Sequence, residues 1–217
     1  MVQVWLSRSP GLGSAKGGAG MRTKCSGAAT AGAMQQVQVY QACIFEPGDI
    51  VEVRAVASGG RVRKFWRIAQ DLPGLAPELA RLNCQGYNIY VGPNPRKGER
   101  LSGDAHVGPC RCLFGDFDKI EPGDGCGIWE FVEPLIEAAG LPMPTFVVFS
   151  GHGVHAYWRL TGALEPDRWA GLQSRLIATL ESDPACKNPE RVMRLPGFLN
   201  VKKPPHVDCF LMFAEGN

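Results

Sequence analysis

The chain has 217 residues, of which 45% are hydrophobic and 20% are charged, and its formal net charge is +2. A chain of this size and composition needs no disulfides for stability, and its charge alone does not indicate a nucleic-acid partner. Because no apolar stretch is long enough to span a membrane and no signal peptide is recognisable, we expect a cytoplasmic protein with reduced cysteines.

The first 35 residues are rich in Gly, Ala and Ser, contain no acidic residue and show no periodicity. We expect residues 1–35 to be a disordered tail; a transit peptide and a start codon assigned too early are the alternatives. The fold is therefore predicted over residues 36–217.

An N-terminal α/β unit is predicted over residues 36–108. Apolar runs on both sides of Ser58-Gly59-Gly60 predict a β-hairpin, helical spacing predicts a helix over Gly74–Cys84, and Tyr87–Val91 predicts a strand. A loop rich in Pro, Gly and Lys follows, and basic residues gather near residues 61–67, 96–100 and 191–203.

The second half, residues 109–217, alternates strands and helices in the order β-α-β-β-α-β, which is typical of ferredoxin-like and RNA-recognition-type sheets. We therefore predict an α+β fold. The last strand is placed at Val207–Phe213 or, alternatively, near Arg191–Leu195. The elements predicted before it are strands Arg111–Asp118, Thr145–Ser150 and Val154–Leu160, and helices Gly127–Ala139 and Glu165–Leu180.

Asp116 and Asp118 stand two residues apart at the end of the strand Arg111–Asp118. Side chains alternate faces along a strand, so both carboxylates lie on one face. Two adjacent carboxylates repel each other unless a divalent cation lies between them, and Mg²⁺ and Mn²⁺ prefer oxygen ligands. A strand that simply ends in a polar turn is the alternative interpretation.

The turn Ser150-Gly151-His152-Gly153 precedes His155 at the start of the next strand. Glycines permit a tight turn, and backbone N–H groups in such turns bind anions. In a sheet whose first strand lies between the third and the fourth, Asp116, Asp118 and His155 meet at one edge. Asp183, after the second helix, approaches the same edge. Carboxylate-bound metal beside a phosphate-binding turn suits two-metal phosphoryl transfer.

Together these motifs resemble the archaeo-eukaryotic primase (AEP) superfamily, in its primase-polymerase branch from plasmids, phages and mobile elements. The resemblance covers roughly residues 46 to 210. The ordered motifs that carry it are Asp116-x-Asp118, Ser150-Gly151-x-Gly153-x-His155, a third acid at Asp183, Arg194-Leu195-Pro196-Gly197-x-x-Asn200-x-Lys202, and Asn88-Ile89-Tyr90-Val91 before Asn94-Pro95-Arg96.

The resemblance implies a DNA primase-polymerase in which Asp116, Asp118 and Asp183 hold two Mg²⁺ or Mn²⁺ ions. Glu181 and Glu190 are alternatives for the third acid. The implied partners are a single-stranded DNA template, NTP or dNTP, and any helicase on a separate polypeptide. Nucleotide contacts are implied for Ser150, Gly151, Gly153, His155, Arg194, Asn200 and Lys202.

Other sites and functions are weighed against this interpretation. Cys110, Cys112, Cys126 and His106 have a spacing that does not favour zinc. A replication-initiator nickase would need paired histidines, but His152 and His155 are separated by two residues rather than one. A non-catalytic RNA-recognition-like module would carry aromatic side chains where this strand carries aspartates.

Overall fold

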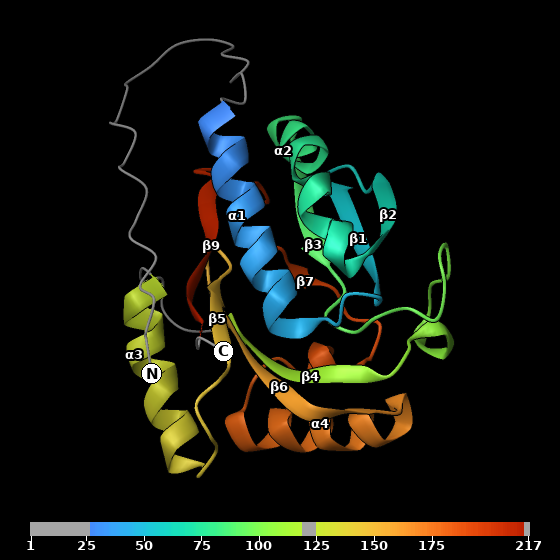
Figure 1. Cartoon of the computed structure of the whole chain (residues 1–217). Coiled ribbons are helices and arrows are strands. Elements are labelled where there is room, and N and C mark those ends of the chain that lie inside the picture. Colours follow the sequence, from blue (N-terminus) through green and yellow to red (C-terminus); the bar gives the residue numbers. More distant parts are fainter. Residues whose placement is uncertain (1–26, 119–124, 215–217) are drawn as a thin grey trace.

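The computed structural model describes residues 27–118 and 125–214. Over these residues the strands form two sheets, one of four strands in the order β2-β1-β3-β7 and one of five strands in the order β4-β6-β5-β9-β8. Figure 1 shows helix α1 lying between the helices that cover the first sheet and strand β9 of the second. The mixture of helices and antiparallel sheets confirms the predicted α+β class.

Helix α1 (Gly27–Ile44) contradicts part of the expectation for residues 1–35, because the last residues of that stretch are helical. Alanine is the strongest helix former, and Ala33 and Tyr40 are buried on the same side of the helix. Ala33 packs against Gly197, where an added Cβ would stand 2.8 Å from the Ala33 Cα. Tertiary packing therefore stabilises a segment whose composition alone indicates disorder. The residues before Gly27 lie outside the described part of the chain.

The predicted hairpin and strand lie in the first sheet, and the predicted helix packs beside it. Among the described residues the strands of this sheet are β1 (Ile50–Ala57), β2 (Val62–Ile68), β3 (Tyr87–Val91) and β7 (Met193–Arg194). Between β2 and β3 the chain forms a 3₁₀ segment η1 (Ala69–Leu75) and helix α2 (Ala76–Cys84). Because β7 comes from the second half of the chain and pairs with β3, the expected units 36–108 and 109–217 are interleaved in space.

One row of side chains crosses all four strands of this sheet. The register places Lys64 opposite Arg54, Arg54 opposite Tyr90, and Tyr90 opposite Arg194. The Arg194 guanidinium lies over the Tyr90 ring, 5.0 Å from its centroid. The buried Glu52 accepts a hydrogen bond of 2.6 Å from Arg54 Nε. A row of three cations and one aromatic ring therefore leads across the sheet to β7.

Along the chain, the second sheet and its helices follow the predicted β-α-β-β-α-β order, with a short unpredicted strand, β8, before the last strand. These elements are β4 (Cys110–Phe117), α3 (Gly125–Ala138), β5 (Phe146–Phe149), β6 (Val154–Leu164), α4 (Pro166–Leu180), β8 (Phe198–Asn200) and β9 (Val207–Ala214), with short 3₁₀ turns η2 (Asp104–His106) and η3 (Pro184–Lys187). Antiparallel pairing joins β4 to β6 and β6 to β5.

The expected position of the fourth strand is wrong. Strand β9 pairs with β5, so β4 is an edge strand rather than an inner strand between β6 and β9. After α4 the chain forms η3 beside β4 and then crosses to the first sheet, where Met193 and Arg194 pair with β3. The alternative strand near Arg191–Leu195 is thus present as β7, but it belongs to the other sheet.

Side chains of α4 cover the free edge of β4. Trp169 Nε1 donates to the Cys112 carbonyl at 2.7 Å. Gln173 Nε2 donates to the Phe114 carbonyl at 2.6 Å, and the Phe114 N–H donates to Gln173 Oε1 at 3.2 Å. Trp169 and Gln173 are fully buried. A helix therefore satisfies backbone groups that a neighbouring strand would otherwise pair.

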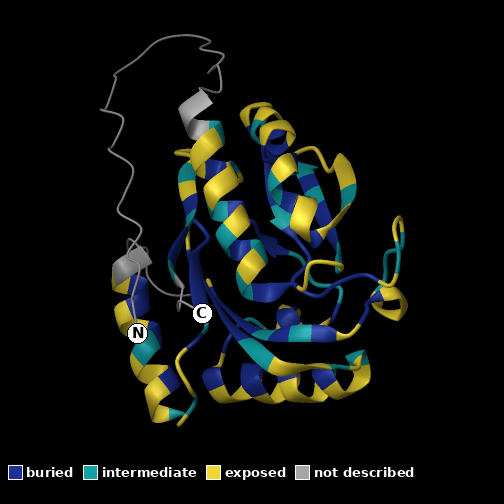
Figure 2. Ribbon diagram, viewed as in Figure 1, coloured by how far each residue is buried: buried dark blue, intermediate teal, exposed yellow. Residues whose placement is uncertain are grey.

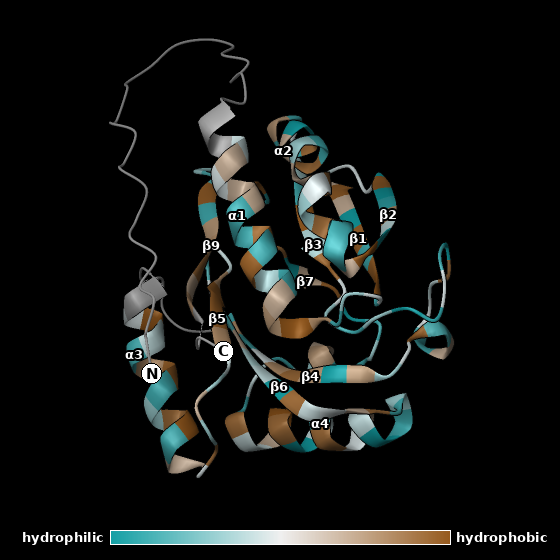
Figure 3. Cartoon of the chain, in the orientation of Figure 1, coloured by the Kyte–Doolittle hydropathy of each residue, from teal (hydrophilic) through white to brown (hydrophobic). Residues whose placement is uncertain are grey.

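The core lies on both faces of the second sheet. Figure 2 shows its strands as mostly buried, and Figure 3 shows apolar residues along them. One apolar cluster joins α1, the first sheet and the inner face, and includes Tyr40, Phe114 and Tyr157. A second cluster, which includes Trp129 and Val132, packs α3 on the outer face. Burial on both faces fixes the positions of the strands that carry the site described below.

The described residues bear on two expectations, the absence of a membrane span and the reduced state of the cysteines. None of the helices among them is both long and apolar enough for a membrane span. Cys84 is disulfide-bonded, so the expectation of reduced thiols is wrong at that residue. The free cysteines among the described residues are Cys43, Cys110, Cys112, Cys186 and Cys209.

Candidate metal and nucleotide site

Asp116 and His155 face each other across the β4–β6 pair. They are direct partners in the register, and His155 Nε2 lies 3.6 Å from Asp116 Oδ1. Asp116 is 6% exposed and His155 is 4% exposed. The two residues that the sequence analysis places at one sheet edge are therefore adjacent in the structure.

Asp183 reaches the same place from the segment after α4. Its N–H donates to the Asp116 carbonyl at 2.9 Å, and its carboxylate accepts from the Ala185 N–H at 3.0 Å. The alternatives lie elsewhere: Glu190 accepts from the Gly103 N–H and pairs with Arg54, while Glu181 is exposed at the end of α4. Asp183 is thus the acid that accompanies Asp116.

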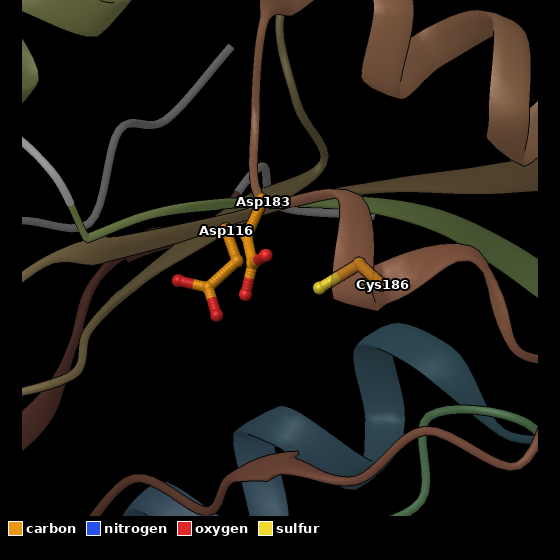
Figure 4. Close-up of side chains that lie close together, drawn as sticks. All are labelled: Asp116, Asp183 and Cys186. Atoms are coloured by element: carbon orange, nitrogen blue, oxygen red, sulfur yellow. The ribbon is translucent and has the colours of Figure 1, made fainter.

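A thiol completes this cluster. Ligand atoms of Asp116, Asp183 and Cys186 all lie within 4.8 Å of one another, and Figure 4 shows the Cys186 sulfur directed toward the two carboxylates. The sequence analysis does not identify Cys186. Its position three residues after Asp183, in a turn begun by Pro184, is a signal that could have found it.

Asp118 follows the end of β4 and is exposed, unlike Asp116. Its carboxylate lies near enough to Asp116 to raise the pKa of that group. It also touches the glycine turn, because a Cβ at Gly153 would stand 2.5 Å from Asp118 Oδ1 and 2.6 Å from the Phe117 carbonyl oxygen. Asp116, Asp118 and Asp183 therefore converge on one region.

The electrostatics of this region favour a bound cation. Burial, followed by the Asp118 and Asp183 carboxylates, raises the pKa of Asp116 to about 8. Burial, followed by the nearby cations Arg194 and Arg191, lowers the pKa of His155 to about 3. Asp116 Oδ1 is buried and accepts no hydrogen bond from residues 27–118 and 125–214. Converging carboxylates with an orphaned buried oxygen fit a divalent ion with oxygen ligands.

The glycine turn is held rigidly beside the cluster. The Ser150 N–H and hydroxyl both donate to the Gly153 carbonyl, at 2.8 and 3.1 Å. Gly151 has φ +97°, and a Cβ there would stand 2.8 Å from the Asn200 Cβ. His152 at the turn tip is exposed. The positive φ and the close approach explain why glycine is required at residue 151.

Asn200 bonds to this turn, and Arg194 bonds to Asn88 within the first sheet. Asn200 Nδ2 donates to the Ser150 carbonyl at 3.0 Å, and Asn200 Oδ1 accepts from the Lys202 N–H at 3.1 Å. Arg194 donates to Asn88 Oδ1 at 2.7 Å. The Lys202 side chain is exposed. Asn200 therefore has a positioning contact with the turn, whereas Lys202 extends toward solvent beside it.

Arg191 is a further cation at this site. Its Nη2 lies 3.6 Å from Asp183 Oδ2, and its Nε is buried with no hydrogen-bond partner among the described residues. The sequence analysis places it in a basic segment without assigning it a role. Of the residues weighed for zinc, Cys110 and Cys112 direct their sulfurs to backbone carbonyls, and the side chain of Cys126 lies outside the described residues.

The sequence matches no known family model and no curated protein. Among solved structures, the chain is similar to the AEP domain of the cyanophage S-2L primase-polymerase, with a TM-score of 0.64 and 24% identity over 84% of this chain and 91% of that chain. It is also similar to primase RepB′, with a TM-score of 0.61 and 18% identity over 85% of this chain and 56% of that chain.

A third similar structure is the catalytic domain of primase RepB′ in complex with initiator DNA. Its TM-score is 0.57 and its identity is 17%, over 83% of this chain and 85% of that chain. The chain therefore has the fold of AEP primase-polymerase catalytic domains, which confirms the resemblance at the level of fold.

Proposed function

We propose that this protein is a primase-polymerase that transfers nucleotides from NTP or dNTP to a 3′-hydroxyl on a single-stranded DNA template. One observation carries the proposal. Asp116 and Asp183, from separate stretches of chain, meet around a buried carboxylate oxygen that accepts no hydrogen bond from the described residues, with Asp118 beside them. Such an arrangement is tolerable when divalent cations neutralise it.

Asp116, Asp118 and Asp183 would hold two Mg²⁺ or Mn²⁺ ions. When bound, such ions favour deprotonation of the attacking hydroxyl and offset the charge of the triphosphate. The protein itself would supply orientation. Because its low pKa keeps His155 neutral, its imidazole can donate one hydrogen bond to a phosphate oxygen without adding charge.

The glycine turn, Arg194, Asn200 and Lys202 would bind the nucleotide. Backbone N–H groups of the turn suit an anion, and Lys202 is exposed beside it. The row from Lys64 through Arg54 and Tyr90 to Arg194 suits the template strand, because cations contact phosphates and an aromatic ring can stack on a base.

The geometry gives little support to the two other functions. A nickase would use paired histidines, but His152 is exposed and His155 is buried. A non-catalytic RNA-recognition-like module would present aromatic rings on the sheet face at this position, where the sheet instead presents Asp116. Neither alternative accounts for the convergence of Asp183 on Asp116.

Primer extension on a single-stranded DNA template with Mg²⁺ or Mn²⁺ tests the proposal. We expect extension by the wild-type protein and a loss of at least about a hundredfold in Asp116→Ala and in Asp118→Ala. Asp71→Ala is the matched control, because Asp71 is exposed on η1. Equal extension by the wild type and by both site variants, with folding intact, contradicts the proposal.

A further inference from the structure

The Cys186 thiol is built into the acidic cluster by its own turn. Asp183 is the N-terminal cap of η3, and the Cys186 N–H donates to the Asp183 carbonyl at 3.1 Å. The Cys186 carbonyl in turn accepts from Gln173 Nε2 at 3.2 Å. These bonds fix both ends of the residue and leave its sulfur directed at Asp116 and Asp183, as Figure 4 shows.

Other buried cysteines of the described chain are placed differently. The sulfurs of Cys110, Cys112 and Cys209 each lie 3.6 to 3.8 Å from a backbone carbonyl oxygen, to which the thiol donates. The Cys186 sulfur instead lies among charged side chains, namely Asp116, Asp183 and Arg191. Burial alone therefore explains the first group, whereas Cys186 faces groups that bind metals.

A second observation points to a ligand at this position. Asp116 is more than nine-tenths buried, and its Oδ1 has no hydrogen-bond partner in the part of the chain that the structure describes, although it lies in the cluster. A buried unpaired carboxylate oxygen in a native protein is rare and calls for an unseen partner. A cation held by the Asp116 carboxylate would also lie within reach of the Cys186 sulfur, because one ligand atom from each of the three residues lies within 4.8 Å of the others.

We infer that Cys186 supplies a thiolate ligand to this site, so that Asp116, Asp183 and Cys186 together bind a borderline or soft divalent ion of the Co²⁺, Zn²⁺ or Cd²⁺ class. The inference rests on the proposed function only in placing a metal at the same aspartates. On binding, the S–H bond breaks, its proton leaves to solvent and the sulfur lone pair forms the metal–sulfur bond, without any redox change.

The thiol separates two groups of ions. Mg²⁺ prefers oxygen ligands and does not coordinate thiolates, so only the two carboxylates would bind it. An ion that accepts sulfur gains a third protein ligand and binds more tightly. Co²⁺, Zn²⁺ and Cd²⁺ would therefore displace Mg²⁺ at this site through Cys186.

Absorption spectroscopy of the full chain with Co²⁺ as the probe tests this inference, since a cobalt–thiolate bond gives a near-ultraviolet charge-transfer band. We expect the band in the wild type and in Cys43→Ala, a matched control because Cys43 is also a free thiol. Cys186→Ala and Cys186→Ser should lose the band and bind Co²⁺ at least about tenfold more weakly, since even outer-shell changes cost that much.

Two results overturn the inference: no thiolate band in the wild type at a full equivalent of Co²⁺, or an unchanged band in a folded Cys186 variant. Cys186→Ser replaces only the sulfur atom and leaves a smaller gap than Cys186→Ala, so it serves if Cys186→Ala fails to fold. Primer extension with Mg²⁺ is measured on the same samples. A Cys186-dependent band without extension refutes the proposed function alone, whereas extension without such a band refutes the thiolate ligand alone.

Discussion

Replacing Asp116 with asparagine removes an ionisable group that the fold buries beside two other carboxylates. The pKa of Asp116 is raised from 3.8 to about 8, so the folded state holds a proton that the unfolded chain releases above about pH 4. For a group whose folded pKa is raised, the stability contribution is complete below the unfolded pKa and is lost as the pH rises toward the folded pKa. Between about pH 4 and pH 7 the loss in wild type is on the order of 4 kcal/mol.

The asparagine side chain has nearly the same shape as the aspartate but does not titrate. In the presence of a metal chelator, we therefore expect the melting temperature of Asp116→Asn to equal that of the wild type near pH 4 and to lie roughly 10 °C above it at pH 7. Adding Mn²⁺ should raise the melting temperature of the wild type and leave the variant unchanged, because the ion needs the carboxylate.

Thermal unfolding followed by circular dichroism over this pH range, with Asp71→Asn as an exposed control, measures the effect. If Asp116→Asn is no more stable than wild type at pH 7 without metal, or if its advantage does not shrink toward pH 4, the raised pKa assigned to Asp116 from its burial and its two neighbouring carboxylates is wrong.

Two further predictions concern the parts that hold the site. Gly153→Ala should reduce primer extension at least about tenfold, because its Cβ would displace Asp118 and the Phe117 backbone. Gly162→Ala is the control, because an added Cβ there meets open space. An equal loss of extension in both variants contradicts the contact at Gly153. Gln173→Leu should lower the free energy of unfolding, measured in urea, by about 2–4 kcal/mol, because it leaves the backbone N–H and carbonyl of Phe114 unpaired. Ser174→Ala changes an exposed neighbour and should lower this free energy far less. Similar losses of stability in the two variants would refute this role of Gln173.

The sequence predicts the local elements well where apolar periodicity is strong. Strand Tyr87–Val91 has the predicted bounds, and helix α4 differs from its prediction by one residue. The pairing of Asp116 with His155 joins β4 to β6, two strands that the β-α-β-β-α-β arrangement expects side by side, so the chain order of the elements is enough to predict it.

Features that depend on long-range packing are missed. Helix α1 has a composition typical of disorder, and its burial comes from partners such as Gly197 far along the chain. The fourth strand is misplaced because Met193 and Arg194 pair with β3, a choice that no local pattern encodes. Cys186 is missed because nearness to Asp183 in the sequence does not show where a thiol points. The η3 turn directs the Cys186 sulfur toward Asp116, and only the fold shows this.

Within the described part of the chain no strand pairs with the outer edge of β4, and this edge has a consequence for aggregation. An open edge offers unpaired backbone groups to any extended segment, including the same strand of a second molecule. Trp169 and Gln173 close that edge, but they lie more than fifty residues later in the chain than Cys112 and Phe114. Until α4 docks, the strand that bears Asp116 is exposed to intermolecular pairing, so damage to α4 should lead to self-association before it leads to a soluble unfolded chain.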